Sequence, residues 1–217
     1  MSIVAVIPAL EINKYSPYGD LSPWGDSNLL EWKISQLKNV SKIDRIIVST
    51  DSSKIGEIAH NAGIDFLKRD RDLSLKDSLM HVCSNLKYDD HILWTNPTSP
   101  FVGEDVFSAL IKQYFDYNSP YDGCVTSRVQ QEFLYTNDGP LNFNSINIIS
   151  RDSLPHVHTI TNGAYLSRCK NVMDRGRMFG NNPIFFEISW LASLEIREFE
   201  QMEFFSSLMQ KYFQGEL

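Results

Sequence analysis

The sequence is poor in several features that mark particular classes of protein. It has only three cysteines, Cys83, Cys124 and Cys169, at spacings that fit no metal-binding motif. Their odd number favours reduced thiols over a disulfide framework. No apolar run approaches the roughly 20 residues of a membrane span. The run from Ile3 to Ala9 has no basic stretch before it and is too short for a signal peptide. We therefore expect a soluble, cytoplasmic protein.

An excess of positive charge is also missing. The chain has 20 lysines and arginines against 27 acidic residues, for a net charge of −7. This balance argues against a nucleic-acid or anionic-membrane partner, although it is compatible with a local basic pocket for one phosphorylated ligand. We find no internal repeat, no low-complexity tract and no Ser-His-Asp or Cys-His signature. A length of 217 residues suits one sizeable core, so we predict a single domain over 1–217.

What the sequence does contain is an alternation of strand and helix patterns. The β-branched run Ile3-Val4-Ala5-Val6-Ile7 has no polar alternation, which is typical of a parallel strand covered on both faces. Further strands are predicted over 44–50, 64–67 and 92–94, with helices near 28–40, 54–62, 79–86 and 104–117. This order predicts an α/β fold with three layers, in which a mostly parallel, twisted sheet carries helices on both faces.

The second half of the chain has a less regular pattern. Strands are predicted over 123–127, 162–166 and 184–188, with helices over 170–175 and 198–213. The segment from about 128 to 160 is mixed and contains the turn sequence Asn137-Asp138-Gly139-Pro140. We predict that this segment forms a small β excursion from the main sheet.

One stretch combines a buried strand with a polar turn. Ile92-Leu93-Trp94 suits a buried pleated surface, and Pro97 and Pro100 stiffen the residues that follow. Small-molecule ligands of open α/β sheets bind beyond the carboxyl ends of the strands, where this turn is expected. An ordinary strand-to-helix connection, with prolines that only stop the strand, is about equally compatible with the composition.

Five stretches, in order, resemble the acylneuraminate cytidylyltransferases. They are Ile7-Pro8-Ala9; Asp44 to Asp51; Asn96-Pro97-Thr98-Ser99-Pro100; Arg151 to Pro155 followed by Asn162-Gly163-Ala164-Tyr165; and Ser193-Leu194-Glu195-Ile196-Arg197. The resemblance implies a nucleotide-diphospho-sugar transferase-like fold. It also implies transfer of CMP from CTP to an acidic sugar, such as a 3-deoxy-2-keto sugar acid, with release of pyrophosphate and with Mg²⁺. A homodimer is implied, in which the excursion of one subunit reaches toward its partner's pocket.

The sequence departs from this family at two points. After Ile-Pro-Ala the family has an Arg-x-Gly-Ser-Lys loop around the phosphates, whereas this chain continues from Leu10 to Ser16 without a glycine. Lys14 is the only nearby cation. The family's closing pair of aspartates is similar to Glu195 and Arg197 here. Glu195 is the expected metal ligand, and Arg197 is suited to a phosphate. Solvated surface charges are about as compatible with this pair.

The resemblance assigns site residues to four roles. The catalytic candidates are Lys14, Arg69 and Glu195; the nucleotide-binding candidates are Pro8, Ala9, Leu10, Asn13, Lys14, Arg69 and Arg71; the acceptor-binding candidates are Asn96, Thr98, Ser99, Asn162, Tyr165 and His156; and the metal ligand is Glu195. A charged surface turn is at least as compatible with Arg69 and Arg71. Two other functions stay open: a nucleotidyltransferase of the same fold with a changed nucleotide or acceptor, and a non-catalytic relative that binds a ligand or partner.

Overall fold

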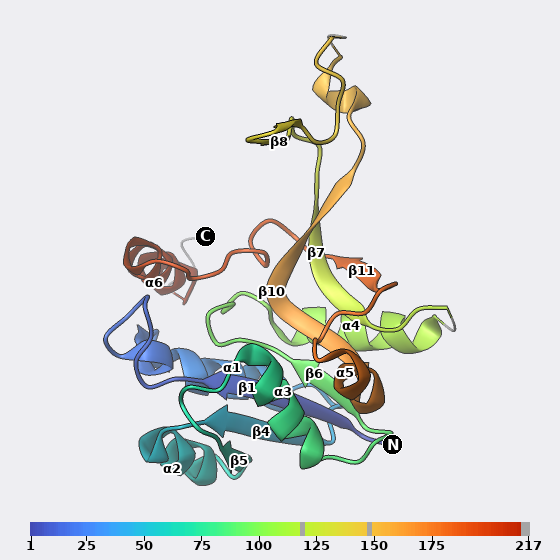
Figure 1. Cartoon of the computed structure of the whole chain (residues 1–217). Coiled ribbons are helices and arrows are strands. Elements are labelled where there is room, and N and C mark those ends of the chain that lie inside the picture. Colours follow the sequence, from blue (N-terminus) through green and yellow to red (C-terminus); the bar gives the residue numbers. More distant parts are fainter. Residues whose placement is uncertain (118–119, 147–148, 214–217) are drawn as a thin grey trace.

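A seven-stranded sheet forms the centre of the computed structural model, which describes residues 1–117, 120–146 and 149–213. The strand order is β11-β7-β10-β6-β1-β4-β5 (Figure 1). In that order the strands are Ile184–Glu187, Cys124–Gln130, Val157–Arg168, His91–Trp94, Ile3–Ala9, Arg45–Thr50 and Asp65–Lys68. The predicted α/β class with a mostly parallel sheet is confirmed.

The pairing pattern explains why the strand sequences lack polar alternation. Strand β1 pairs in parallel with β4 on one side and β6 on the other, and β5 continues the parallel set. Only β10 is antiparallel to both of its neighbours, β6 and β7. Central strands of such a sheet are covered on both faces, so successive residues on both sides must be apolar. Val4, Ala5, Val6 and Ile7 are all essentially inaccessible to solvent.

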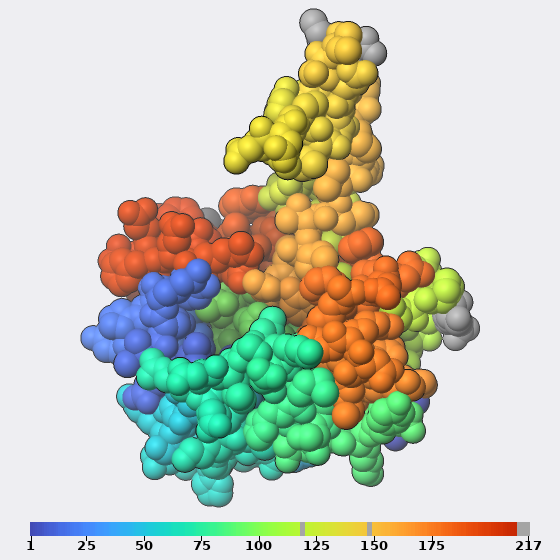
Figure 2. All heavy atoms as spheres, in the orientation of Figure 1, coloured from blue at the N-terminus to red at the C-terminus, as the bar shows by residue number. Residues whose placement is uncertain are grey.

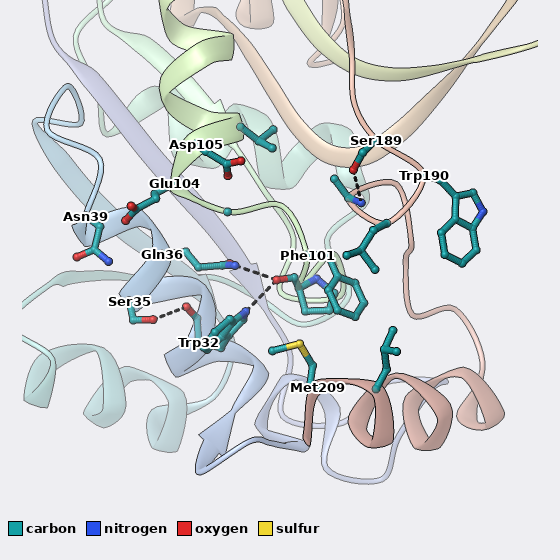
Figure 3. Close-up of a pocket in the computed structure, with 16 residues that line it drawn as sticks. Trp32, Ser35, Gln36, Asn39, Phe101, Glu104, Asp105, Ser189, Trp190 and Met209 are labelled. Carbon is teal, nitrogen blue, oxygen red and sulfur yellow. Dashed lines mark hydrogen bonds between the residues drawn. The ribbon is translucent and has the colours of Figure 1, made fainter. Parts of the chain in front are cut away.

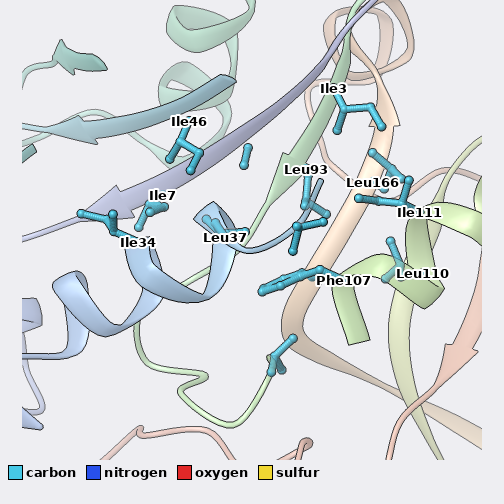
Figure 4. Close-up of a cluster of buried hydrophobic side chains, with 14 of the residues drawn as sticks. Ile3, Ile7, Ile34, Leu37, Ile46, Leu93, Phe107, Leu110, Ile111 and Leu166 are labelled. Carbon is cyan, nitrogen blue, oxygen red and sulfur yellow. The ribbon is translucent and has the colours of Figure 1, made fainter. Parts of the chain in front are cut away.

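Helices cover both faces of the sheet. The six helices of the described residues are α1 (Leu29–Lys38), α2 (Ser53–Asn61), α3 (Leu75–Ser84), α4 (Glu104–Asp116), α5 (Cys169–Arg175) and α6 (Phe199–Phe213). Helices α1, α2 and α4 pack against one face, where Ile34, Leu37 and Phe107 meet Ile7 and Leu93 (Figure 4). Helices α3 and α5 pack against the other face. The sheet and the helices on its two faces are the three layers predicted from the sequence.

Helix α3 begins earlier than the sequence pattern indicates. The apolar spacing predicts a helix from Leu79, but the structure starts it at Leu75. The first turn is fixed by Ser74, whose hydroxyl accepts a hydrogen bond from the Asp77 amide at 3.1 Å and donates one to the Asp77 carboxylate at 2.6 Å. This reciprocal cap stabilises a turn that has little apolar surface of its own.

The long loop after β1 is folded back on itself. It contains a 3-10 turn, η1 (Gly19–Leu21), and a short ladder of β2 (Pro23–Trp24) with β3 (Ser27–Asn28). Gly19 has φ +51°, and a Cβ atom there would lie 2.2 Å from the Leu10 carbonyl oxygen. Helix α6 covers this loop through a small cluster that includes Trp24 and Phe205. The loop is therefore an ordered wall next to the end of β1.

Replacing Gly19 by alanine is expected to disturb this wall. A side chain at φ +51° is strained, and the atom that its Cβ would meet belongs to the backbone and cannot rotate away. We expect the Gly19→Ala variant to lose about 1–2 kcal/mol of unfolding free energy in urea denaturation. Gly63 is the matched control, because its φ is +68° but a Cβ there meets nothing within 4 Å. Equal losses in the two variants would exclude the steric contact with Leu10 as the cause.

The predicted excursion projects from the body as an arm. Strands β7 and β10 extend beyond the sheet and carry a small ladder of β8 (Tyr135–Thr136) with β9 (Gly139–Pro140), followed by the 3-10 turn η2 (Arg151–Ser153). Figures 1 and 2 show the arm, in yellow and orange, standing away from the rest of the molecule. Residues 147 and 148 of the predicted excursion lie outside the described residues.

Candidate active site

A pocket of about 380 Å³ lies beyond the carboxyl ends of β1 and β6. Its lining residues are Pro8, Leu10, Asn13, Tyr15, Asp20, Arg69, Leu75, Trp94, Asn96, Pro97, Thr98, Asn162, Tyr165, Arg177, Met178, Phe179 and Glu195. These residues come from the ends of β1 and β6 and the loops that follow them, the segment after β5, the start of α3, strand β10, the turn after α5 and the segment before α6. This is where an open α/β sheet is expected to bind a ligand.

The pocket brings together nine of the residues predicted from the sequence. They are Pro8, Leu10, Asn13, Arg69, Asn96, Thr98, Asn162, Tyr165 and Glu195. Leu10 and Asn13 of the first loop thus face the same cavity as Asn96, Pro97 and Thr98 of the turn after β6.

Five other predicted residues do not line this pocket. Ala9 is fully buried in the sheet core, and buried Ser99 accepts a hydrogen bond from Lys33 through its carbonyl oxygen. Lys14 is exposed, with its Nζ 5.0 Å from the centre of the Tyr15 ring. Arg71 is 3.9 Å from Asp51 on the surface, and exposed His156 immediately precedes β10 on the arm.

Buried hydrogen bonds hold the turn after β6 in place. The Lys33 side chain is fully buried, and its Nζ donates to the carbonyl oxygens of Ser99 and Val102, both at 2.9 Å. Trp32 Nε1 and Gln36 Nε2 both donate to the Pro100 carbonyl at 2.8 Å. Helix α1 therefore supplies donors to backbone carbonyls that the prolines and the sharp turn leave without partners in the sheet. The turn is rigid where it presents Asn96 and Thr98 to the pocket.

A polar network joins β10 to the segment before α6. Asn162 Nδ2 donates to Glu195 Oε1 at 2.6 Å, and the Tyr165 hydroxyl donates to Asn162 Oδ1 at 2.7 Å. The Asn96 amide donates to the Asn162 carbonyl at 3.3 Å, and the Ile196 amide donates to the Thr98 carbonyl at 2.8 Å. Burial, followed by the nearby Glu195 carboxylate, raises the pKa of Tyr165 to about 12. The phenol therefore stays protonated and fixes the orientation of the Asn162 amide.

Glu195 is already engaged by two partners. Asn162 occupies Oε1, and Arg197 contacts Oε2 through Nη2 at 2.6 Å and Nε at 2.7 Å. Among the described residues, no group of three or more His, Cys, Asp or Glu side chains could hold a metal ion. Mg²⁺ can be bound by one carboxylate together with substrate phosphates and water. The residues present would therefore fit a divalent cation that Glu195 holds together with nucleotide phosphates, but not a site made by the protein alone.

Side chains of the first loop accept hydrogen bonds from backbone amides of the same loop. Asp20 Oδ2 accepts a hydrogen bond from the Leu10 amide at 2.7 Å, and Asn13 Oδ1 accepts from the amides of Tyr15 and Ser16 at 2.9 and 3.0 Å. Burial raises the pKa of Asp20 to about 7, although the Leu10 hydrogen bond and the charge of Arg69 act in the opposite direction. The loop thus presents a carboxyl group to the pocket in place of a row of free amides.

Three pocket residues carry chemistry that the sequence motifs do not reveal. Asp20 lies in a loop stretch outside the matching motifs, and Tyr15 lies beside the more conspicuous Lys14. Arg177 follows Gly176, the glycine that ends α5 with φ +65°. The sequence does contain one indication of Arg177: it is a positively charged residue directly after the glycine that ends a predicted helix, in the connection to a predicted strand.

A larger hollow of about 860 Å³ lies behind the turn after β6. Figure 3 shows Trp32, Phe101, Trp190 and Met209 around it. Two of its polar side chains, Trp32 and Gln36, donate hydrogen bonds to the Pro100 carbonyl. The smaller pocket is the better candidate active site, because convergent amide, hydroxyl, carboxyl and guanidinium groups line it.

Among the described residues, no helix has the length and apolar character needed to cross a membrane.

Comparison with known proteins identifies a family and a fold. A family model described as cytidylyltransferase matches residues 20–210. No curated protein gives a significant match. Among solved structures, 4-diphosphocytidyl-2C-methyl-D-erythritol synthase from Anaerococcus prevotii superposes with a TM-score of 0.73 at 16% identity, covering 96% of each chain. CMP:2-keto-3-deoxy-manno-octonic acid synthetase complexed with CTP gives 0.74 at 14% identity, covering 98% of this chain and 100% of that one.

Proposed function

The chain belongs to the cytidylyltransferase family and is a CTP-using nucleotidyltransferase, and we propose that its acceptor is an acidic sugar of the 3-deoxy-2-keto acid class. The observation that carries this proposal is the single pocket shared by the first loop, Asn96, Thr98, Asn162 and Glu195. A similar fold is found in the synthetase named for CMP and 2-keto-3-deoxy-manno-octonic acid. The pocket's mixture of amide, hydroxyl and guanidinium groups suits a polyhydroxylated acid.

The proposed reaction is a nucleotidyl transfer. An acceptor hydroxyl oxygen bonds to the α-phosphorus of CTP, the bond from that phosphorus to the β-phosphate oxygen breaks, pyrophosphate leaves, and the hydroxyl proton passes to water. Such a reaction depends mainly on positioning and on stabilisation of charge on the phosphate oxygens. Asn96, Thr98 and Asn162 orient the acceptor in this proposal, with Tyr165 holding the Asn162 amide. Arg69 contributes positive charge to the nucleotide.

Mg²⁺ belongs to this proposal as a partner of the nucleotide. When bound, it would offset negative charge on the phosphate oxygens, with Glu195 as its protein ligand. The family resemblance also assigned Lys14, Arg71 and His156 to the site. Because these three side chains do not line the pocket, we propose no contact for them within a single subunit.

The test measures both binding and turnover. The protein is incubated with CTP, MgCl₂ and either 2-keto-3-deoxy-manno-octonate or N-acetylneuraminate, and pyrophosphate release and the CMP-sugar are followed. In a thermal-shift experiment, CTP at about 100 times its Kd should stabilise the protein by about 2.7 kcal/mol. Failure of CTP to bind contradicts the proposal. CTP binding with turnover only of neutral or phosphorylated acceptors supports the alternative of a changed acceptor, which the rebuilt first loop favours.

We propose that the arm makes a homodimer. Its tip exposes Tyr135, Leu141 and Ile146, and the Phe143 ring lies 5.0 Å from the rings of both Phe133 and Tyr135. An aromatic cluster at the end of a projecting hairpin has apolar surface available for a partner.

The double variant Leu141→Asp, Ile146→Asp is expected to be monomeric where the wild type is dimeric, because it places charge in the buried centre of the interface. Light scattering after size-exclusion chromatography measures the mass of both. The matched control is Asp138→Asn, a change at the exposed turn of the same hairpin. A wild-type mass of 24.9 kDa would contradict the dimer.

A further inference from the structure

The turn after α5 contributes one wall of the pocket. It supplies three consecutive lining residues, Arg177, Met178 and Phe179. Gly176 places this turn against α3, since a Cβ on Gly176 would come within 2.8 Å of the Lys76 side chain. Helices α3 and α5 lie on the same face of the sheet (Figure 1). The position of Arg177 is therefore set by the packing of two helices against the sheet.

The Arg177 guanidinium is held by neutral partners only. It lies 5.3 Å from the centre of the Phe179 ring, and Nη2 donates a hydrogen bond to Asn181 Oδ1. No carboxylate in the described part of the chain lies within ion-pair distance of it. Arg175, two residues earlier, pairs with Asp122 at 2.8 Å. Arg175 is thus paired with a carboxylate, whereas Arg177, two residues later, is held in position without a counter-ion.

Arg69, which follows β5, shows the same property. It also lines the pocket and has no ion-pair partner among the described residues, and its buried Nε has no hydrogen-bond acceptor. The two pocket carboxyl groups come from other segments, Asp20 from the first loop and Glu195 from the segment before α6. Within the described part of the chain, Arg69 Nη1 has only the Asp70 carbonyl as an acceptor, at 3.4 Å. The pocket lining therefore includes two guanidinium groups without an ion-pair partner among the described residues, in a protein with a net charge of −7. Such groups are suited to planar, bidentate binding of phosphate or carboxylate oxygens.

We propose that Arg177 is a substrate-binding residue that holds an anionic group, a phosphate or a carboxylate, on the α5 side of the pocket. This inference rests on the proposed function and deepens it. Arg177 supplies, from a different wall, a positive charge that the rebuilt first loop does not bring into the pocket. The exposed Arg177 side chain already contacts the Phe179 ring and Asn181, which lowers the side-chain freedom that remains to be lost when the anion binds.

The test compares the Arg177→Gln variant with wild type by calorimetric titration in MgCl₂. The probes are cytidine, CMP, CTP, inorganic pyrophosphate and 2-keto-3-deoxy-manno-octonate. Loss of one charge-assisted hydrogen bond weakens binding by about 10-fold or more. The matched control is Arg45→Gln, which removes an exposed arginine that pairs with Asp65, outside the pocket.

The pattern of losses identifies the anion. If Arg177 holds the outer phosphates, the variant binds CTP and pyrophosphate about 10-fold more weakly, whereas cytidine and CMP change less than about 2-fold. If it holds the acceptor, CTP binding is unchanged and only sugar-acid binding is weakened. Unchanged affinity for every probe that the wild type binds overturns the inference about Arg177. A wild type that binds no cytidine nucleotide overturns the proposed function itself.

Discussion

Replacing Lys33 by alanine is expected to lower the free energy of unfolding by about 3 kcal/mol, measured by urea denaturation. The substitution removes the two hydrogen bonds that Nζ donates to the Ser99 and Val102 carbonyls and leaves a cavity next to the Phe107 ring, whose centre is 5.2 Å from Nζ. The Ser99 carbonyl keeps a bond of 3.3 Å from the Val102 amide, so the Val102 carbonyl is the more affected of the two. Buried carbonyls without donors and unfilled core volume are each destabilising. A Lys33→Ala variant within about 1 kcal/mol of wild type would contradict this account of the turn.

Lys33→Met separates the two contributions. Methionine fills most of the side-chain volume but cannot donate, so its loss of about 1–2 kcal/mol excludes the cavity and reports on the two carbonyls together with the burial of the amine. Both variants should also weaken binding of the acceptor sugar acid, because Lys33 no longer holds the turn that presents Asn96 and Thr98. Gln36→Ala is the matched control for the turn, since it removes one donor to Pro100 from a partly exposed site on the same helix.

The pH dependence of the Lys33 effect follows from burial. Desolvation lowers the pKa of Lys33 to about 7 from 10.5. Between these values the unfolded chain binds a proton that the folded chain does not, so stability rises with pH across this window. A neutral amine still carries two N–H groups for the two carbonyls. Wild type should therefore gain stability over Lys33→Met as the pH rises from 7 toward 10.

The fold was largely predictable because buried parallel strands and capped helices leave local signals. The β-branched run at Ile3 to Ile7 forms β1, and Asn28 caps α1 by accepting a hydrogen bond from the Glu31 amide at 3.0 Å. The start of α3 was less predictable, since its first turn is stabilised by a side-chain cap and not by an apolar face. Local patterns also cannot show how far the arm projects, which depends on where β7 and β10 leave the sheet.

The site was predictable only where motifs mark it. Asn96 and Thr98 were expected in the site because they follow a predicted strand, where open α/β sheets bind ligands. Asn162 and Tyr165, which lie within the antiparallel strand β10, were expected there only from the family resemblance. The sequence does not show which side chains of the loop after β1 point into the pocket. Asn13 and Tyr15 line the pocket while Lys14 between them is exposed, and no sequence pattern indicates which of three consecutive loop residues points inward.

The rebuilt first loop has a consequence for the way the pocket responds to pH. Asp20 lines the pocket in which we propose that CTP binds, and burial raises the pKa of its carboxyl group to about 7. Below this pH the neutral carboxyl group does not repel phosphate; above it the carboxylate does. A single phosphate charge about 8 Å from a carboxylate is repelled by about 2 kcal/mol at an effective dielectric constant of about 20, or about 30-fold in affinity.

The Asp20→Asn variant should therefore bind CTP about 10- to 100-fold more tightly than wild type at pH 8, with little difference at pH 5.5. The asparagine Oδ1 atom can still accept the Leu10 amide, so the loop keeps its hydrogen bond. Calorimetric titration at several pH values measures the effect. The phosphates of CTP titrate in the same way whether wild type or the variant is present. The ratio of the variant's CTP affinity to that of wild type at each pH therefore reports only the effect of the Asp20 carboxyl group. Asp26→Asn, an exposed change in the same loop, is the matched control.

The apo protein gives an independent measurement of the same carboxyl group. Since the pKa of Asp20 is raised on folding from 3.8 to about 7, the folded chain binds the extra proton between these values. The stability that Asp20 contributes is then present at low pH and is lost as the pH rises through about 7. Asp20→Asn should accordingly gain stability relative to wild type between pH 4 and 8 in thermal melts. The contrary result is that the melting temperatures of wild type and Asp20→Asn change with pH in the same way, and that their CTP affinities do too. It would show that Asp20 is ionised at every pH tested and does not control the charge of the pocket.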